Sequence, residues 1–310
     1  MRVAIIGAGG VGGYYGAQLA RHGYEVHLLA RGAHLDAIRA RGLDIRTPDG
    51  TWAVPVHATD DPTALADAFG PGDLAVVAVK AYSLAEIAPA VRLLADRGTV
   101  ILPLLNGVDA ADRLAALGVA RTQLVGGVTY VSAERTAPGI VMRHSPFQRV
   151  LVGELHGGVS DRTERIAAAF RAAGADAQAT ADIALALWQK FVFLVSMSAA
   201  CGLARSPIGP LRDSALGRRL IERAVREAAA VGRARGIALP ATEEARVLAL
   251  VDSVPAGMKP SFLLDVEAGG RTELEVLSGA VARFAEEAGV DTPVHDTAAA
   301  ALAGPDAPDA

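Results

Sequence analysis

This 310-residue chain has few cysteines and lysines, a small net charge and no long apolar run. Cys201 is its one cysteine, so no intrachain disulfide can form, and a reducing compartment fits. A net charge of −4 gives no reason to expect nucleic acid as a partner. The most apolar run, residues 191–204, is short for a bilayer span and favours a buried helix. We therefore expect a cytoplasmic protein without a signal peptide, a membrane partner or a metal site.

Lysine is the scarcest of the common charged residues. Of the 30 Lys and Arg residues, only Lys80, Lys190 and Lys259 are lysine. Lysine differs from arginine in that its pKa can approach neutrality, which suits proton transfer. The three lysines are therefore candidates for a role in catalysis. The alternative for each is that it is lysine by chance and has no chemical role.

A glycine-rich turn follows an apolar segment near the start of the chain. Residues 3–6 are typical of a buried parallel strand, and residues 11–21 have helical composition. Between them the G-x-G-x-x-G pattern predicts a tight turn, a close approach to a pyrophosphate, and close helix–strand packing. The phosphates would meet the amino end of the helix. The predicted cofactor turn is Gly7, Ala8, Gly9, Gly10, Val11 and Gly12; the alternative is a glycine turn without a ligand.

A second predicted strand, residues 25–30, ends at Arg31. In a dinucleotide fold this strand end meets the adenosine ribose, where an acidic residue would favour NAD. Arginine can instead pair with a 2′-phosphate through two hydrogen bonds. Arg31 therefore favours NADP(H), the alternative being an ordinary exposed arginine.

Two further buried strands, residues 74–79 and 100–105, lead to Lys80 and Asn106. Ligands of open α/β sheets bind beyond the carboxyl ends of the strands, so both side chains join the glycine turn as site candidates. The rest of this half is predicted as an antiparallel excursion near 54–56, a continuation of the sheet at 124–130, a β pair at 140–142 and 150–152, and a helix at 163–173.

From about residue 181 the pattern becomes helical. Glycine and proline punctuate predicted helices at 184–200, 216–235, 242–254, 261–268 and 273–288. The predicted fold class is α/β: a Rossmann-type domain over 1–180 and an all-α domain over 181–303. Residues 304–310 are predicted to be a disordered tail.

Lys190 lies among aromatic and aliphatic residues of the first helix in the second half. Desolvation there would lower its pKa and make it a proton donor to a carbonyl oxygen. The alternative is a lysine that extends from a core helix to solvent. Ser261 is either a helix N-cap or a hydroxyl that contacts a carboxylate. Glu273 lies between Thr272 and Glu275, a possible capping box, and either complements a helix dipole or holds Lys190 or the substrate.

The order of these motifs resembles the ketopantoate reductase (2-dehydropantoate 2-reductase) family, to about residue 296. The matching segments are residues 7–12, 79–81, 106–107, 187–191, 261–265 and 272–273. The resemblance implies a Rossmann-type domain and a helical domain like those of 6-phosphogluconate dehydrogenase relatives. It also implies reduction of 2-dehydropantoate to pantoate by NADPH in pantothenate biosynthesis.

The resemblance assigns roles to individual residues. It places Arg31, Lys80, Asn106 and Ala133 at the cofactor, makes Lys190 and Glu273 the catalytic pair, and places Asn106, Lys190, Ser198 and Ser261 at the substrate.

The chain departs from the family pattern on the substrate side. The family has asparagines four and eight residues after the catalytic lysine, where this chain has Leu194 and Ser198. Loss of those amides removes hydrogen bonds to a polar hydroxy acid. An NADP-dependent reductase or dehydrogenase of a different, more apolar 2-oxo or 3-hydroxy acid, and an NADP(H)-binding sensor without turnover, therefore remain alternatives. A homodimer is possible.

Overall fold

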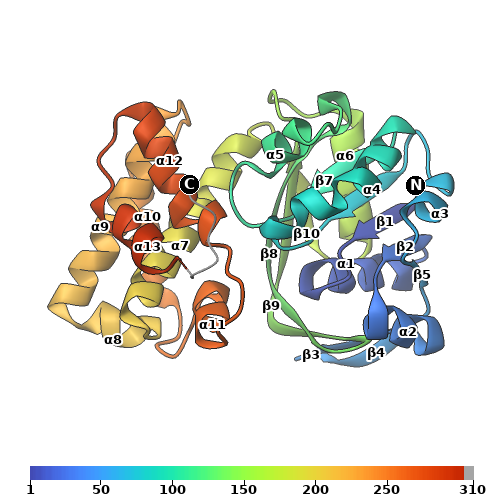
Figure 1. Ribbon diagram of the computed structural model, residues 1–310, viewed down its shortest axis with the longest axis horizontal. Helices are drawn as coiled ribbons and strands as arrows, with labels where there is room; N and C mark the ends of the chain where they lie inside the picture. Colours follow the sequence, from blue (N-terminus) through green and yellow to red (C-terminus); the bar gives the residue numbers. More distant parts are fainter. Residues whose placement is uncertain (304–310) are drawn as a thin grey trace. The chain divides into compact units, whose positions relative to one another are not determined.

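The computed structural model describes residues 1–303, so the tail predicted over 304–310 lies outside the described residues. Contacts divide the chain into two compact units. The first holds residues 1–105 and 109–183, and the second holds residues 106–108 and those from 184 on. Figure 1 shows strands and helices together in the first unit, and helices throughout the described part of the second. This architecture confirms the predicted fold class, a Rossmann-type unit and an all-α unit.

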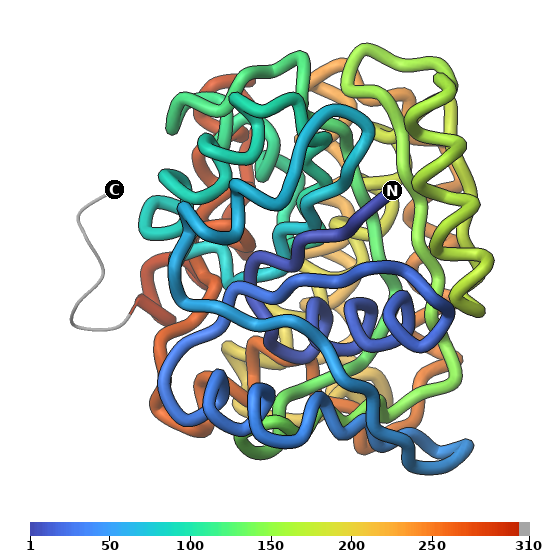
Figure 2. The backbone as a smooth tube through the Cα atoms, turned by 90° about the vertical axis from the view of Figure 1, so that its right-hand side faces the viewer, coloured from blue at the N-terminus to red at the C-terminus, as the bar shows by residue number. Residues whose placement is uncertain are grey.

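The first unit is built on a parallel sheet with the strand order β5-β2-β1-β6-β7. The central strand β1 and its neighbour β6 are buried along their whole length, which explains their unbroken apolar sequences. The strands are β1 (Val3–Ile6), β2 (Val26–Leu29), β5 (His57–Thr59), β6 (Leu74–Val77) and β7 (Val100–Pro103). The helices beside them are α1 (Gly10–Arg21), α2 (Gly32–Arg41), α3 (Pro62–Asp67), α4 (Leu84–Asp96) and α5 (Ala110–Ala116), and Figure 2 traces the first of them as blue coils.

A second sheet in this unit has the order β10-β9-β3-β4, with β8 antiparallel to β9. Its strands are β3 (Leu43–Thr47), β4 (Gly50–Val54), β8 (Gly126–Ala137), β9 (Ile140–Gly153) and β10 (Asp176–Ala179), and α6 (Asp161–Ala172) packs on β9 and β10. The helix that follows the glycine turn, α1, contacts strands of both sheets. Its buried residues Tyr14, Tyr15 and Leu19 therefore belong to one core shared by the two sheets.

Two strand predictions are wrong in this region. Residues 124–130 continue the parallel sheet only at their start: Leu124 forms a parallel bridge with Ile101 of β7, and from Gly126 the chain belongs to β8 of the second sheet. Gly127 permits this path, since a Cβ there would lie 2.5 Å from Leu102 Cδ1. The segments 140–142 and 150–152 do not form a pair, because both lie within the single strand β9. The predicted excursion near 54–56 is the antiparallel pair of β3 and β4, which ends at Val54.

The second unit consists of helices around a hydrophobic core. They are α7 (Ile183–Ala204), α8 (Ile208–Asp213), α9 (Ala215–Ala234), α10 (Glu243–Ser253), α11 (Ser261–Glu267), the short 3-10 helix η3 (Leu274–Val276), α12 (Ser278–Ala288) and α13 (Pro293–Ala301). Helix α9 contacts α8, α10, α12 and α13. Helices α8 and α13 were not predicted from the sequence.

Helix α7 is long and apolar enough, by length and composition alone, to cross a membrane. It has 22 residues, more than the apolar run noted in the sequence, and 61% of its most apolar window is buried inside the protein. Phe191, Val195 and Ala200 are fully or almost fully buried in the core of the second unit. These contacts are those expected of the central helix of a folded domain.

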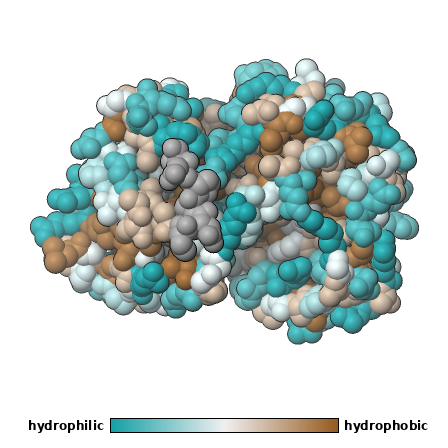
Figure 3. Space-filling model, viewed as in Figure 1, coloured by the Kyte–Doolittle hydropathy of each residue, from teal (hydrophilic) through white to brown (hydrophobic). Residues whose placement is uncertain are grey.

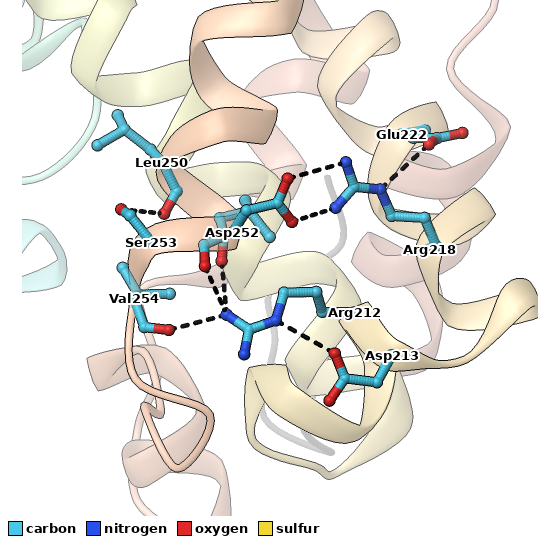
Figure 4. A network of polar contacts seen from close by, with 9 residues as sticks. Arg212, Asp213, Arg218, Glu222, Leu250, Asp252, Ser253 and Val254 are labelled. Carbon is cyan, nitrogen blue, oxygen red and sulfur yellow. Dashed lines mark hydrogen bonds and ion pairs between the residues drawn. The ribbon is translucent and has the colours of Figure 1, made fainter.

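An arginine network ties α8, α9 and α10 together (Figure 4). Arg212 Nη1 donates to the carbonyl oxygens of Val251, Asp252 and Val254 at 3.0, 3.2 and 2.8 Å. These carbonyls lie at the carboxyl end of α10, where no intrahelical donor remains. Arg218 from α9 pairs with the Asp252 carboxylate. The network therefore caps one helix and joins it to two others.

The predicted helix over 273–288 is wrong in its first turn. The segment forms η3 and α12, separated by Leu277 with φ −106° and ψ −109°, which are not helical angles. Glu273 precedes η3, and no side chain caps that helix, so the capping box of Thr272 and Glu275 is absent. The N-cap prediction for Ser261 is wrong as well, because Pro260 is the N-cap of α11.

Hydrophilic residues dominate the face in Figure 3, where hydrophobic residues form small separate groups. Among the described residues the exposed large hydrophobic side chains are Met1, Phe147, Val159, Leu216, Leu250 and Leu264. Such scattered residues are ordinary on a protein surface.

Candidate active site

The glycine turn lies at the carboxyl end of the central strand β1 and leads directly into α1. Gly7 has φ +99°, which side-chain-bearing residues rarely adopt, and a Cβ there would lie 2.6 Å from Val79 Cγ1. A Cβ on Gly12 would lie 2.2 Å from the carbonyl oxygen of Gly7. Both positions therefore require glycine for the turn and for close packing of the helix.

Gly9 differs from the other two glycines of the pattern, because it faces open space. A Cβ there would meet no atom within 4 Å in the described part of the chain, its immediate neighbours aside. Gly9 is also the N-cap of α1, and no side chain caps the first turn of that helix. The turn thus offers room and backbone N–H groups to an anion, as a pyrophosphate requires.

Strand β8 passes over the beginning of α1 at the predicted cofactor residue Ala133. A Cβ added to Gly10 would lie 2.1 Å from the carbonyl oxygen of Ala133. Backbone therefore packs on backbone here, and Gly10 is needed for this contact.

Arg31 and Lys80 follow β2 and β6, the two parallel neighbours of β1. The carboxyl ends of these strands share one edge of the sheet, so both residues lie on the side of the glycine turn. Lys80 is half-buried and is the N-cap of a short 3-10 helix. Arg31 is exposed, and its guanidinium pairs with the Glu86 carboxylate of α4, which raises the pKa of Arg31. Nothing in the sequence indicated Glu86 as a partner.

Lys190, Asn106 and Glu273 meet within the second unit. Lys190 Nζ donates to Asn106 Oδ1 at 3.2 Å, and Asn106 Nδ2 donates to Glu273 Oε2 at 3.2 Å. An ammonium group only donates and a carboxylate only accepts, so the orientation of the amide between them is determined. The structure therefore places Asn106 as the link between the two predicted catalytic residues.

Burial lowers the pKa of Lys190 to about 8, and the negative charge of Glu273 partly offsets that effect. At neutral pH the group is mostly ammonium and can still release a proton readily, as general acid catalysis requires. Glu273 is 6% exposed, so water screens its charge poorly.

Next to Lys190, helix α7 is held by an ion pair on α10 in which the glutamate is buried and the arginine is exposed. Arg246 pairs with Glu243, which is 1% exposed, and Arg246 Nη2 donates to the Gln189 carbonyl oxygen at 2.8 Å. This contact holds the backbone directly before Lys190.

The remaining predicted substrate residues have different surroundings. Ser261 is exposed in the first turn of α11. Leu194, one turn after Lys190, is half-buried. The Ser198 hydroxyl is buried and has no hydrogen-bond partner among the described residues. Residues 1–303 contain no group of three or more His, Cys, Asp or Glu side chains that could hold a metal ion.

Residues 3–157 match the family described as ketopantoate reductase PanE/ApbA, and residues 182–305 match its C-terminal domain. The chain belongs to the ketopantoate reductase family. A 2-dehydropantoate 2-reductase of Halobacterium salinarum is 38% identical over 304 residues, 96% of this chain and 97% of the relative. The predicted family is therefore confirmed.

Solved structures agree with this assignment to the ketopantoate reductase family. The crystal structure of 2-dehydropantoate 2-reductase from Geobacter metallireducens has a TM-score of 0.88 and 30% identity, covering 97% of this chain and 99% of that one. A D-mandelate dehydrogenase solved with NADH and anilino(oxo)acetate has a TM-score of 0.86, 22% identity and 97% coverage of both chains. At that identity the second likeness concerns the fold.

Proposed function

We propose that this protein reduces 2-dehydropantoate to pantoate with NADPH. The observation that carries the proposal is the hydrogen-bonded chain Lys190–Asn106–Glu273 in a member of the ketopantoate reductase family. A binding module has no need of a half-buried lysine with a pKa near 8 linked to a buried carboxylate. This feature favours an enzyme over an NADP(H) sensor.

The glycine turn fits the pyrophosphate of a dinucleotide, because Gly9 faces open space and the first turn of α1 lacks a side-chain cap. When bound, NADPH supplies the hydride that is added to the carbonyl carbon of the 2-oxo acid. Arg31 would bind the 2′-phosphate, for which it must leave Glu86 or share its guanidinium with it. Lys80 and Ala133 complete the proposed cofactor residues.

Lys190 would donate a proton from Nζ to the carbonyl oxygen as hydride reaches the carbonyl carbon, and the product is a 2-hydroxy acid. Asn106 holds the ammonium group through Oδ1 and is itself held by Glu273. Glu273 also favours the protonated form of Lys190 by its charge. Lysine and glutamate would therefore act together, with the amide as positioning residue.

The substrate carboxylate would meet Ser261, which presents its hydroxyl at the exposed first turn of α11. Leu194 replaces an amide by an apolar side chain one turn from Lys190, and this observation favours a second candidate, a reductase of a more apolar 2-oxo acid. Ser198 stays a predicted substrate residue, and a cytoplasmic homodimer stays a prediction.

The test is NADPH oxidation by the purified protein with 2-dehydropantoate and a panel of apolar 2-oxo acids. Lys190→Ala should lower kcat by about 10²–10⁴-fold, the usual contribution of a general acid. Lys259→Ala is the matched control, since Lys259 pairs with Glu267 near the surface, and it should retain activity. Undiminished turnover by Lys190→Ala would contradict the proposed role. Tight NADPH binding without turnover of any acid would favour the sensor.

A further inference from the structure

His34 is a buried histidine that the proposed reaction does not use. It lies in α2, three residues after Arg31, and is 5% exposed. Its ring contacts backbone groups on both sides. Nε2 lies 2.7 Å from the carbonyl oxygen of Ala8, and the Gly139 N–H donates to Nδ1 at 2.9 Å.

The two contacts define the protonation state of the ring. A backbone N–H only donates, so Nδ1 must accept, and a carbonyl only accepts, so Nε2 must carry the hydrogen. The ring is therefore neutral in this arrangement. Burial lowers the pKa of His34, and the positive charge of Arg135 acts in the same direction, while the bond to Ala8 opposes them.

One of the contacts reaches the cofactor turn itself. Ala8 is the second residue of the glycine turn and lies between Gly7 and the open position Gly9. A bond to its carbonyl oxygen fixes the peptide plane between Ala8 and Gly9, and with it the direction of the Gly9 N–H. His34 thus contacts the turn through a backbone carbonyl oxygen, which leaves the N–H groups of the turn unobstructed by its ring.

The other contact reaches the β8–β9 connection, which α2 holds at two points. Besides the bond from Gly139 to His34, Arg41 Nη2 donates to the Pro138 carbonyl oxygen at 3.0 Å. The same hairpin places Ala133 against Gly10 at the beginning of α1. A single ring therefore joins the glycine turn to the hairpin that packs on it.

We propose that His34 is a positioning residue for dinucleotide binding, which holds the Ala8 carbonyl so that the glycine turn presents its N–H groups to the pyrophosphate. The proposal rests on the cofactor role of that turn in the proposed function. It predicts that changes at His34 weaken NADPH binding while leaving the proton-transfer residues of the second unit undisturbed.

Three variants separate the two contacts of the ring. A glutamine amide reaches the position of Nε2 and can donate to Ala8, whereas an asparagine amide reaches only the position of Nδ1 and can serve Gly139. His34→Ala removes both contacts. We expect the NADPH dissociation constant to rise about tenfold in His34→Ala and His34→Asn, as for one lost buried hydrogen bond, and less than about threefold in His34→Gln. The kcat at saturating NADPH should change less than about twofold in all three.

A control is needed for loss of stability alone. Ser160→Ala removes the side-chain cap of α6 in the same unit, where Ser160 accepts from the Thr163 N–H, and should lower Tm without changing NADPH affinity. NADPH binding is measured by calorimetry at a temperature well below the Tm of each variant. If His34→Ala fails to fold, the proposal is tested by comparing the NADPH dissociation constants of His34→Gln and His34→Asn.

An NADPH dissociation constant within twofold of the wild type in both His34→Asn and His34→Ala would overturn the proposal. Equal weakening in His34→Gln and His34→Asn would overturn it too, because Ala8 would then not be the contact that matters. If the wild type itself binds neither NADPH nor NADH, the proposed function fails instead, so the two failures are distinguishable.

Discussion

Glu273→Gln should shift the pH dependence of catalysis toward lower pH. If Lys190 is the proton donor, kcat/KM falls as pH rises through its pKa, about 8 in this structure. The Glu273 carboxylate stabilises the ammonium form, so removing its charge lowers the pKa of Lys190 further. Glutamine keeps the size of the side chain and an oxygen that can accept from Asn106.

The size of this pKa shift follows from the distance between Lys190 and Glu273, which are joined through Asn106. Two hydrogen bonds of 3.2 Å joined by one amide separate Nζ from the carboxylate oxygen. At an effective dielectric constant of about 20 and a separation of up to about 9 Å, the attraction is about 2 kcal/mol. Since 1.4 kcal/mol corresponds to about one pKa unit, the expected shift is about one unit.

The assay is the initial rate of NADPH oxidation with 2-dehydropantoate, measured across the neutral and alkaline range for wild type and variant. Glu275→Gln is the control, because it removes the same charge from an exposed side chain two residues away. It should leave the alkaline limb nearly unmoved. An unmoved or upward-shifted limb in Glu273→Gln, or no limb near pH 8 in the wild type, would refute the reasoning about Lys190.

Four other outcomes follow from particular side chains. Glu86→Gln frees Arg31, so the dissociation constant of NADPH should fall about threefold while that of NADH stays unchanged, and Arg31→Ala should weaken NADPH far more than NADH in the same binding assay. Leu194→Asn restores an amide one turn after Lys190, so kcat/KM for 2-dehydropantoate should rise relative to that for apolar 2-oxo acids, and an unchanged ratio would contradict the role given to Leu194. Burial lowers the pKa of His295 to about 4, below its unfolded value, so its contribution to stability is present above about pH 6.5 and is lost on acidification toward pH 4. The free energy of unfolding, measured in urea, should fall by up to about 3 kcal/mol over this pH range in the wild type, and this fall should be missing in His295→Gln.

Much of the fold was predictable because its signals are local. The strand before Gly7, the glycine turn and the helix after it form one continuous segment, and each has its own pattern. Helices α9 and α10 likewise showed apolar periodicity between glycine and proline boundaries, and their ends differ from the prediction by one residue. Local patterns of this kind need no knowledge of the tertiary structure.

What the sequence did not reveal depends on distant partners. Strand β8 belongs to the second sheet because β9, its neighbour in the chain, pairs with the distant strand β3 through residues 140–142 and 44–46. Residues 140–153 carry no uniform alternation that would indicate this strand. Helix α13 begins where Glu227 of α9 accepts from the N–H groups of Val294 and His295 at 3.0–3.1 Å, a cap supplied by another helix. Glu227 lies 67 positions before Val294, so no local pattern indicates this cap.

The candidate site likewise has features that the local sequence predicted and contacts between distant residues that it did not. Lys190 was predictable from the scarcity of lysine and its apolar neighbours. The link through Asn106 was not, because that residue lies 84 positions from Lys190 and 167 from Glu273. The pair of Arg31 with Glu86, 55 positions apart, and the two backbone contacts of His34 were hidden for the same reason.

Formation of pantoate tests the proposed reaction and the role of Lys190 together. Purified protein is incubated with NADPH and 2-dehydropantoate, and pantoate and oxidised cofactor are quantified together by NMR. The proposed reaction yields one pantoate for each NADPH consumed by the wild type, and almost none with Lys190→Ala, although that variant still binds NADPH. Tight binding of NADPH by the wild type without any pantoate would contradict the proposed reaction, and equal yields from both proteins would contradict the role of Lys190.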